Sequence, residues 1–249
     1  MKKIQDGYQN EFLFVMEFNN KKIKELNPML RQVIDDLYPS YPEDAVIKSW
    51  RNHNNQEKGD ILLKVNGHLR SISIKMGSRN SVHMESLKTF KYFLSKNGVD
   101  SKTIEEYEKY HYGADDFSQK ILSASEYSLY NQDSIKMINK KLANISHYNI
   151  AERFLLKGNV SYYEVDGIIH GTPHDFLWIN KHEVRDILKE NLSRESKSVH
   201  YGCLFIQPFN RCMNDNNKYA WGKDYVQIKW YSLFDDIIKY KNDRICKEQ

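Results

Sequence analysis

A pair of turn-forming residues, Asn66-Gly67, constrains this sequence more than any other feature. The pair suits the positive φ angles of a two-residue turn that joins two antiparallel strands. On either side lie short runs in which apolar and polar residues alternate, from Asp60 to Val65 and from His68 to Met76. Residues 60–76 are therefore predicted to form a β-hairpin.

The turn determines which residues of the two strands face one another. Counting outward from it places Ile61 opposite Ile72 and Asp60 opposite Ser73. Because side chains alternate between the two faces of a strand, one face of the hairpin is apolar and the other is polar. The apolar face carries Ile61, Leu63, Ile72 and Ile74, and the polar face carries Asp60, Ser73 and Lys75. Lys75 is thus a diagonal neighbour of Asp60, so the two charged groups can converge on one small ligand.

The polar face of the hairpin has part of the composition of a metal-dependent hydrolytic site. A carboxylate, a lysine and a second acid that meet at a strand end can hold a divalent cation and activate a water molecule beside a phosphate. Asp60 and Lys75 are separated by fourteen residues, and Ser73 stands two positions before the lysine. The hairpin itself carries no second acid.

The segment Gly59-Asp60, followed by Ser73-Ile74-Lys75, resembles the core motif of the PD-(D/E)XK nucleases, the superfamily of many restriction endonucleases. The usual acid two residues before the lysine is replaced by Ser73. In this respect the chain is similar to a branch of type II restriction enzymes that has Ser-x-Lys on the strand and takes the missing acid from a helix about a dozen residues later. The resemblance covers roughly residues 57–95, about a sixth of the chain, and the usual proline before the aspartate is absent.

The candidate for the missing acid is Glu85, ten residues after Lys75. A helix built on the apolar residues Leu87, Phe90, Phe93 and Leu94 is expected to end near Gly98. If Ser86 caps this helix, Glu85 lies in the preceding loop and is free to turn toward Asp60. A helix that began at Val82 would instead direct Glu85 away from the packed face. His83 and Glu57 are the other possible contributors.

The resemblance implies a fold, a cofactor and a partner. It implies an α/β fold with a mixed central sheet flanked by helices, in a single domain over residues 1–249 with a helical insertion at 99–157. It implies a Mg²⁺-dependent endonuclease, a homodimer that cuts both strands of a short symmetric site in double-stranded DNA. Asp60 and Glu85 would bind Mg²⁺, Lys75 would orient or help deprotonate the attacking water, and Ser73 would hydrogen-bond a ligand or water.

Several polar side chains are candidates for contacts to DNA. The polar segment 49–59 leads into the hairpin beside the proposed metal site, which places its basic residues within reach of phosphate. The segment from Gln207 to Arg211 carries side chains suited to base edges and phosphates. The predicted DNA contacts are Arg51, Lys58, Arg79, Asn80, His83 and Arg211. Solvation on an exposed loop is the alternative explanation for each of them.

A second motif, Gln227-Ile228-Lys229, competes with the first, since Gln-x-Lys is a variant of the same pattern in related nucleases. The acid nearest to hairpin distance before it is Asp215, across an Asn-rich loop. We expect this segment to be a strand of the sheet. Its buried face would consist of Val226, Ile228 and Trp230, with Gln227 and Lys229 on the other side.

Two further groups of potential metal ligands have simpler explanations. His170 and His174 have the spacing of a zinc site only on a helix, and the intervening Gly171 and Pro173 argue against one. Asp115-Asp116 follows a glycine and is read as part of an exposed loop.

Composition indicates a globular protein without secretory or membrane features. Lys and Arg exceed Asp and Glu by 37 to 33, a net charge of +4 that suits a polyanionic partner without demanding one. Cys203, Cys212 and Cys246 are odd in number and lack CxxC spacing, so neither a disulfide framework nor a zinc ribbon is indicated. No apolar run reaches 18 residues, and the first residues do not form a signal peptide, so a cytoplasmic protein without membrane contact is expected.

Hydrophobic periodicity divides the rest of the chain into helices and strands. Helices are expected at residues 20–37, 103–110, 120–130, 134–145, 181–191 and 233–240. Strands are expected at residues 161–170, 175–179, 199–207 and 225–231. The strand-rich final third would complete the sheet that the hairpin begins.

Three functions remain open on the sequence alone. The first is a nuclease of restriction type, for which a role in repair or phage recombination, or an RNA substrate, also stays open. The second is a DNA-binding protein of the same fold with a decayed active site. The third is an unrelated α/β protein in which Asp60 and Lys75 form only a surface ion pair.

Overall fold

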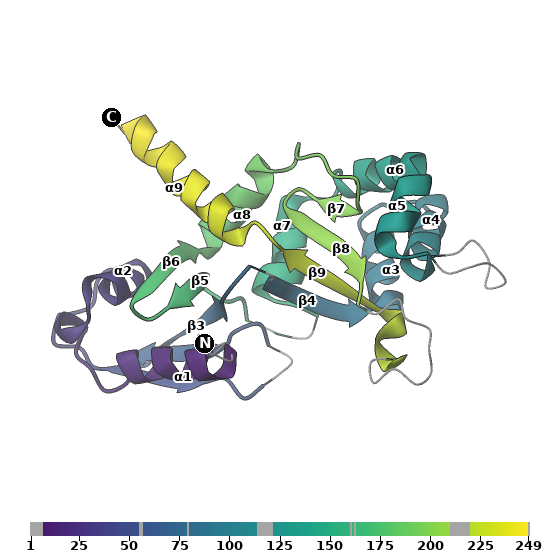
Figure 1. Cartoon of the computed structure of the whole chain (residues 1–249). Helices are drawn as coiled ribbons and strands as arrows, with labels where there is room; N and C mark the ends of the chain where they lie inside the picture. Colours follow the sequence, from purple (N-terminus) through teal and green to yellow (C-terminus); the bar gives the residue numbers. More distant parts are fainter. Residues whose placement is uncertain are drawn as a thin grey trace, which may run out of the picture. The chain divides into compact units, whose positions relative to one another are not determined.

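The structure is a computed structural model that describes residues 7–54, 57–78, 80–113, 122–159, 161, 163–209 and 220–248. The chain folds into two compact units. Unit 1 comprises residues 1–80, 151–187 and 232–249, and unit 2 comprises residues 81–150 and 188–231. Each unit has its own β-sheet (Figure 1).

Unit 1 is built on a five-stranded sheet with the order β1-β2-β3-β5-β6. The strands are β1 (Ile47–Arg51), β2 (Ile61–Val65), β3 (His68–Lys75), β5 (Gly167–Thr172) and β6 (Asp175–Asn180). Neighbouring strands are antiparallel, except β3 and β5, which run parallel. A parallel pair needs a crossover connection, and the segment that connects these two strands includes residues 81–150 of unit 2.

The predicted hairpin is confirmed as β2 and β3. Asn66 and Gly67 have φ angles of 45° and 90°, as a two-residue turn of this kind requires. Ile61 pairs with Ile72 in the predicted register. The apolar face is also confirmed, since Ile61, Leu63, Ile72 and Ile74 are all buried.

Helices α1 (Gly7–Phe18) and α2 (Pro28–Leu37), with the 3₁₀ turn η1 (Ile23–Glu25), pack on this apolar face. Unit 1 also contains the π-helical turn η2 (Ala151–Leu156), the start of α8 (Lys181–Glu190) and α9 (Leu233–Glu248). Phe14, Phe18, Leu30 and Ile34 pack with the strands in one core. The single helix expected at 20–37 is instead a 3₁₀ turn followed by α2, because the Asn27 side chain caps a helix that begins at a proline.

Unit 2 contains a four-stranded sheet with the order β4-β9-β8-β7. Its strands are β4 (Asn80–Ser86), β9 (Tyr225–Trp230), β8 (Leu204–Pro208) and β7 (His200–Tyr201). The helices of this unit are α3 (Leu87–Lys96), α4 (Ser101–Tyr112), α5 (Ala124–Tyr130), α6 (Gln132–Leu142) and α7 (His147–Ile150), with the 3₁₀ turn η3 (Ala220–Asp224). Contacts of α3 with β9, of α4 with β8 and of α6 with β7 join helices to this sheet.

The predicted fold class is confirmed, because a mixed sheet is flanked by helices in an α/β arrangement. The segment 99–157 is largely helical as expected, with α4, α5 and α6 in unit 2. Its description as an insertion into one domain over residues 1–249 stays a prediction. In the described part of the chain, no helix is long and apolar enough to cross a membrane.

Candidate active site

Asp60 is held at the entrance of β2 by the backbone on both sides. Its N–H donates to Ile72 O at 2.9 Å, and its carbonyl accepts from Asn52 N at 3.0 Å. These bonds extend the pairing of the strands by one residue toward β1 and β3. The carboxylate of Asp60 is therefore fixed beside the end of β3, where Ser73 and Lys75 lie.

The side chains of Asp60, Ser73 and Lys75 form one hydrogen-bonded cluster. Asp60 Oδ2 accepts from Ser73 Oγ at 3.0 Å, from Ile74 N at 2.5 Å and from Lys75 Nζ at 3.2 Å. Lys75 Nζ also donates to Ser73 Oγ at 2.7 Å and to Ile74 O at 3.1 Å. Ser73 is buried, whereas the side chains of Asp60 and Lys75 are 26% and 18% exposed. The charged groups are thus positioned and still open to a ligand.

One oxygen of the Asp60 carboxylate is left open. All three donors contact Oδ2, and no described residue donates a hydrogen bond to Oδ1. A carboxylate oxygen with free lone pairs is a ligand that Mg²⁺ accepts. The cluster therefore holds Asp60 still through one oxygen and presents the other.

A second carboxylate, Glu11 on α1, is coupled to the same site. Glu11 Oε2 accepts from Arg51 Nε at 2.9 Å and lies 2.8 Å from Arg51 Nη2. The guanidinium carbon of Arg51 lies 3.3 Å from the ring centroid of Tyr8. In the described part of the chain, no residue donates to Glu11 Oε1. Glu11 thus resembles Asp60 in having one oxygen held and one oxygen open.

The charges of the hairpin act on Glu11. Burial raises the pKa of the Glu11 carboxyl above its ordinary value, and the negative charge of Asp60 raises it further, while Arg51 and Lys75 lower it. The neighbouring residue Asn10 is buried and donates from Nδ2 to Gly171 O at 2.8 Å, which fixes α1 against β5. Sequence analysis missed Glu11, because its only signal is a polar pair, Asn10-Glu11, at the edge of an apolar run.

Glu85 lies elsewhere than expected. The loop position predicted for it is wrong, because β4 continues through Glu85 to Ser86. The predicted cap is confirmed, since Ser86 Oγ accepts from Thr89 N at 3.1 Å at the start of α3. The Glu85 side chain is 1% exposed in unit 2, and its Oε1 lies 3.5 Å from His83 Nε2. Its role as a metal ligand stays a prediction.

The predicted DNA contacts occupy varied positions. Arg51 is engaged by Glu11, and Lys58 is half-buried in the loop before the hairpin. Asn80 and His83 are buried, and Asn80 Nδ2 donates to Gly77 O at 3.0 Å. Arg79 and Arg211 lie outside the described residues. Their contacts to DNA stay predictions.

Glu57, another possible contributor, organises the loop before the hairpin. Its carboxylate accepts from Asn52 Nδ2 at 2.7 Å and from Asn54 Nδ2 at 3.0 Å. Both oxygens of Glu57 are therefore engaged within its own loop, unlike those of Asp60 and Glu11.

The competing motif on β9 has the predicted strand geometry. Val226, Ile228 and Trp230 are fully buried, whereas Gln227 and Lys229 are partly exposed. Gln227 Nε2 donates to Ser81 Oγ at 3.1 Å. No acidic side chain among the described residues pairs with Lys229, and Asp215 lies outside them.

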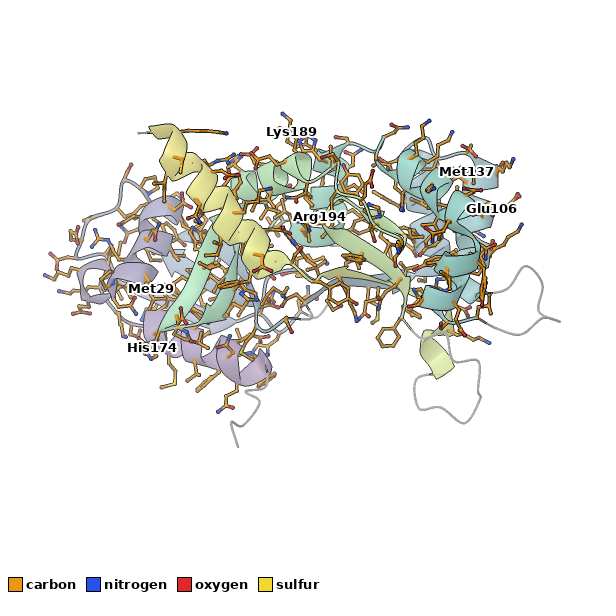
Figure 2. The ribbon with its side chains drawn as sticks, turned by 45° about the horizontal axis from the view of Figure 1, so that its top comes forward. Met29, Glu106, Met137, His174, Lys189 and Arg194 are labelled. Atoms are coloured by element: carbon orange, nitrogen blue, oxygen red, sulfur yellow. The ribbon has the colours of Figure 1, made fainter. Side chains whose placement is uncertain are left out.

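The two histidines with metal-like spacing do not lie on a helix. His170 is on β5, where its Nε2 lies 2.9 Å from Gly77 O. His174 is in the turn between β5 and β6, where Figure 2 labels it. Across the described ranges, no three His, Cys, Asp or Glu side chains gather closely enough to hold a metal ion. Asp115 and Asp116 lie outside those ranges.

The hairpin site fits Mg²⁺ better than a metal that needs a full set of protein ligands. Mg²⁺ usually keeps several waters and is bound by one or two carboxylates together with substrate phosphates. Asp60 and Glu11 each have one carboxylate oxygen to which none of the described residues donates, and Lys75 supplies a cation beside Asp60. The absence of a three-ligand cluster in the described chain is therefore compatible with this ion.

Comparison with solved structures identifies a similar fold. The crystal structure of the restriction endonuclease MspI in complex with its cognate DNA matches with a TM-score of 0.58 and 14% sequence identity, over 92% of this chain and 93% of that chain. The chain has a restriction-endonuclease-like fold. No protein-family model and no curated protein matches the sequence.

Proposed function

We propose that this protein is a Mg²⁺-dependent endonuclease that hydrolyses phosphodiester bonds of double-stranded DNA, as a site-specific restriction enzyme of type II. The observation that carries the proposal is the cluster of Asp60, Ser73 and Lys75 at the end of a hairpin in a restriction-endonuclease-like fold. A surface ion pair alone would not need a buried serine between its two charged groups.

We assign the cation to Asp60 and Glu11, because each has one carboxylate oxygen that is open and one that is held. Glu85 is the alternative second ligand that the sequence resemblance implies. When bound, Mg²⁺ would polarise the scissile phosphate and lower the pKa of the attacking water. The three donors to Asp60 Oδ2 would keep Asp60 Oδ1 directed at the cation during the reaction.

Lys75 and Ser73 act on the water and on the developing charge. The Lys75 ammonium would orient the attacking water and offset negative charge on the phosphate. It could help to deprotonate the water only as the neutral amine, after giving up a proton of its own. Ser73 accepts from Lys75 and donates to Asp60, so it fixes the distance between them. Positioning of this kind contributes to the rate because the groups need no rearrangement in the transition state.

The proposed partner is double-stranded DNA, and the proposed assembly is a homodimer. MspI was crystallised with its cognate DNA, and the net charge of +4 suits a polyanion. Cutting both strands of a symmetric site requires two active sites related by a twofold axis, which a homodimer supplies.

A cleavage assay tests the proposed function. Supercoiled plasmid and phage-sized linear DNA are incubated with the protein in Mg²⁺ or in EDTA. Discrete fragments in Mg²⁺ and intact DNA in EDTA are expected, and the fragments would also reveal the target site. Retention of DNA on a filter without any cleavage would indicate a DNA-binding protein with a decayed site, and neither activity would indicate an unrelated α/β protein.

A further inference from the structure

Unit 2 contains a cavity of about 630 Å³ that is unrelated to the hairpin motif. It is lined by residues of α6, by Ala143 directly after that helix, and by residues of the segment 192–202, all of which belong to unit 2. Its volume lies within the range of about 300–1,000 Å³ that is typical of small-molecule sites.

The lining of the cavity is strongly basic. Lys136, Lys140, Arg194 and Lys197 contribute to it, with a single acidic residue, Glu195. Within the described ranges, none of the three lysine ammonium groups has an ion-pair partner, whereas the adjacent Lys141 lies 2.8 Å from Asp100. Lys136 and Lys140 are one helical turn apart, and like charges at that spacing repel each other. A bound anion would remove this repulsion.

A buried histidine, His200, is fixed in the wall of the cavity by contacts of both ring nitrogens. His200 is 7% exposed, its Nδ1 lies 3.0 Å from Ser198 O, and its Nε2 lies 2.8 Å from Arg194 O. Both ring nitrogens thus lie against carbonyl oxygens of the segment 194–198, which fixes the side chain in the wall.

The cavity is built by side chains that fix the segment across from α6. Asn139 Nδ2 donates to Ser198 O at 3.0 Å, and Asn139 Oδ1 accepts from His200 N at 3.0 Å. Ser196 Oγ accepts from Ser198 N at 3.1 Å. These bonds tie the segment that carries Arg194 and Lys197 to the helix that carries the two lysines. The basic groups are thus gathered by the fold and not by chance on an open surface.

We infer that this cavity binds a ligand that carries phosphate groups. Lysine ammonium groups and arginine bind phosphate through charge-assisted hydrogen bonds, and several cations together match a polyanion better than a single carboxylate. The phosphates would belong to a free phosphorylated small molecule or to a nucleic-acid backbone, which share this chemistry. The inference does not depend on nuclease activity at Asp60.

Calorimetric titration with sodium pyrophosphate tests the site. The titration is carried out at low salt in EDTA, so that a divalent cation at the hairpin does not contribute. The test variant is Lys136→Gln/Lys140→Gln, and the matched control is Lys88→Gln/Lys189→Gln. The control removes the same two charges from exposed positions outside the cavity, one of them on α8 where Figure 2 labels Lys189.

Saturable binding of one pyrophosphate per chain is expected, with affinity at least tenfold weaker in the test variant and within twofold of wild type in the control. All four lysines are exposed, so both variants should melt at the wild-type temperature. Displacement of pyrophosphate by ADP or by a 12-base-pair duplex then identifies the small-molecule or the nucleic-acid source. No saturable binding by wild type, or equal weakening in both variants, would overturn the inference.

Discussion

The carboxylate of Asp60 and the ammonium of Lys75 lie 3.2 Å apart, although fifteen positions separate them in the sequence. The turn at Asn66-Gly67 brings them together, and Ser73 bridges them. Partly exposed ion pairs of this kind contribute only about 0–1 kcal/mol to stability. A conservative substitution that keeps an acceptor for Ile74 N, such as Asp60→Asn, therefore reports mainly on the chemistry of the site.

Asp60→Asn is expected to weaken divalent-cation binding. The variant keeps a side-chain oxygen that can accept from Ile74 N, so the hairpin should fold, but the negative charge is lost. Substitution of a residue that only supports a metal ligand typically lowers the affinity for the metal by roughly 10- to 100-fold. Loss of a direct ligand should lower the affinity for the cation by at least as much. Titration with Mn²⁺, followed by electron paramagnetic resonance, measures this directly. Equal Mn²⁺ affinity in the variant and the wild type would remove Asp60 from the site.

The identity of the second acid is decided by comparing Glu11→Gln with Glu85→Gln. Glu11 responds to the charges of Asp60 and Lys75, so Glu11→Gln should weaken Mn²⁺ binding by a factor similar to that of Asp60→Asn. Glu85→Gln should leave Mn²⁺ affinity nearly unchanged. The opposite order of effects would assign the second ligand to Glu85. The control is Glu25→Gln, which removes the same charge at an exposed position on η1.

Gly59→Ala is expected to destabilise the protein and to disturb Asp60. A Cβ at residue 59 would lie 1.8 Å from Ser71 Oγ and 3.2 Å from Ser71 Cβ, so one of the two segments has to move. Overpacking of this kind costs about 1–3 kcal/mol, which urea denaturation would measure. Adding Ser71→Ala removes the closest atom and should restore most of the lost stability. Failure of the double variant to recover would place the cause elsewhere.

The stability contributed by Glu106 should depend on pH. Its carboxylate accepts from Lys109 Nζ at 2.9 Å and from Ser134 Oγ at 2.8 Å, and the bond from Lys109 holds the pKa of Glu106 below its ordinary value. A lowered pKa in the folded state stabilises the protein above the unfolded pKa, and this contribution is lost as pH falls through the folded pKa.

Glu106→Gln should therefore lower the free energy of unfolding by roughly 1 kcal/mol at neutral pH. The difference from wild type should shrink as pH falls below about 4.5, the ordinary value for this carboxyl. Denaturation curves of both proteins from pH 7 to pH 3 provide the measurement. A difference that stays constant across this range would contradict the assigned ion pair.

The hairpin could be predicted because everything that specifies it is local. Asn66-Gly67 determines the turn, alternation determines the faces, and the register of Asp60 against Lys75 follows by counting. Glu11 could not be predicted in the same way, because its approach depends on how α1 packs on the sheet. That packing is decided by long-range contacts such as the bond from Asn10 to Gly171, which leave no local signal.

Two strands were missed for a related reason. β1 (Ile47–Arg51) includes the first residues of the polar segment 49–59, which was interpreted as a loop, and β4 (Asn80–Ser86) includes Glu85, which was expected in the loop before the helix. β1 pairs with β2, and β4 pairs with β9. The residues of a segment do not by themselves show that it has such a partner strand. The missed strand β4 also explains why Glu85 was placed in a loop.

The most direct test of the central claim is cleavage by Lys75→Ala under single-turnover conditions in Mg²⁺, measured against wild type and Lys64→Ala. Lys64 is an exposed lysine of the same hairpin with no ion-pair partner among the described residues. Positioned acid–base groups contribute about 10²- to 10⁴-fold to the rate of reaction. Lys75→Ala should therefore cut DNA at least about 100-fold more slowly than wild type, and Lys64→Ala should cut at the wild-type rate. Both variants should remain folded. Wild-type cleavage that survives intact in Lys75→Ala would contradict the assignment of the active site to this hairpin.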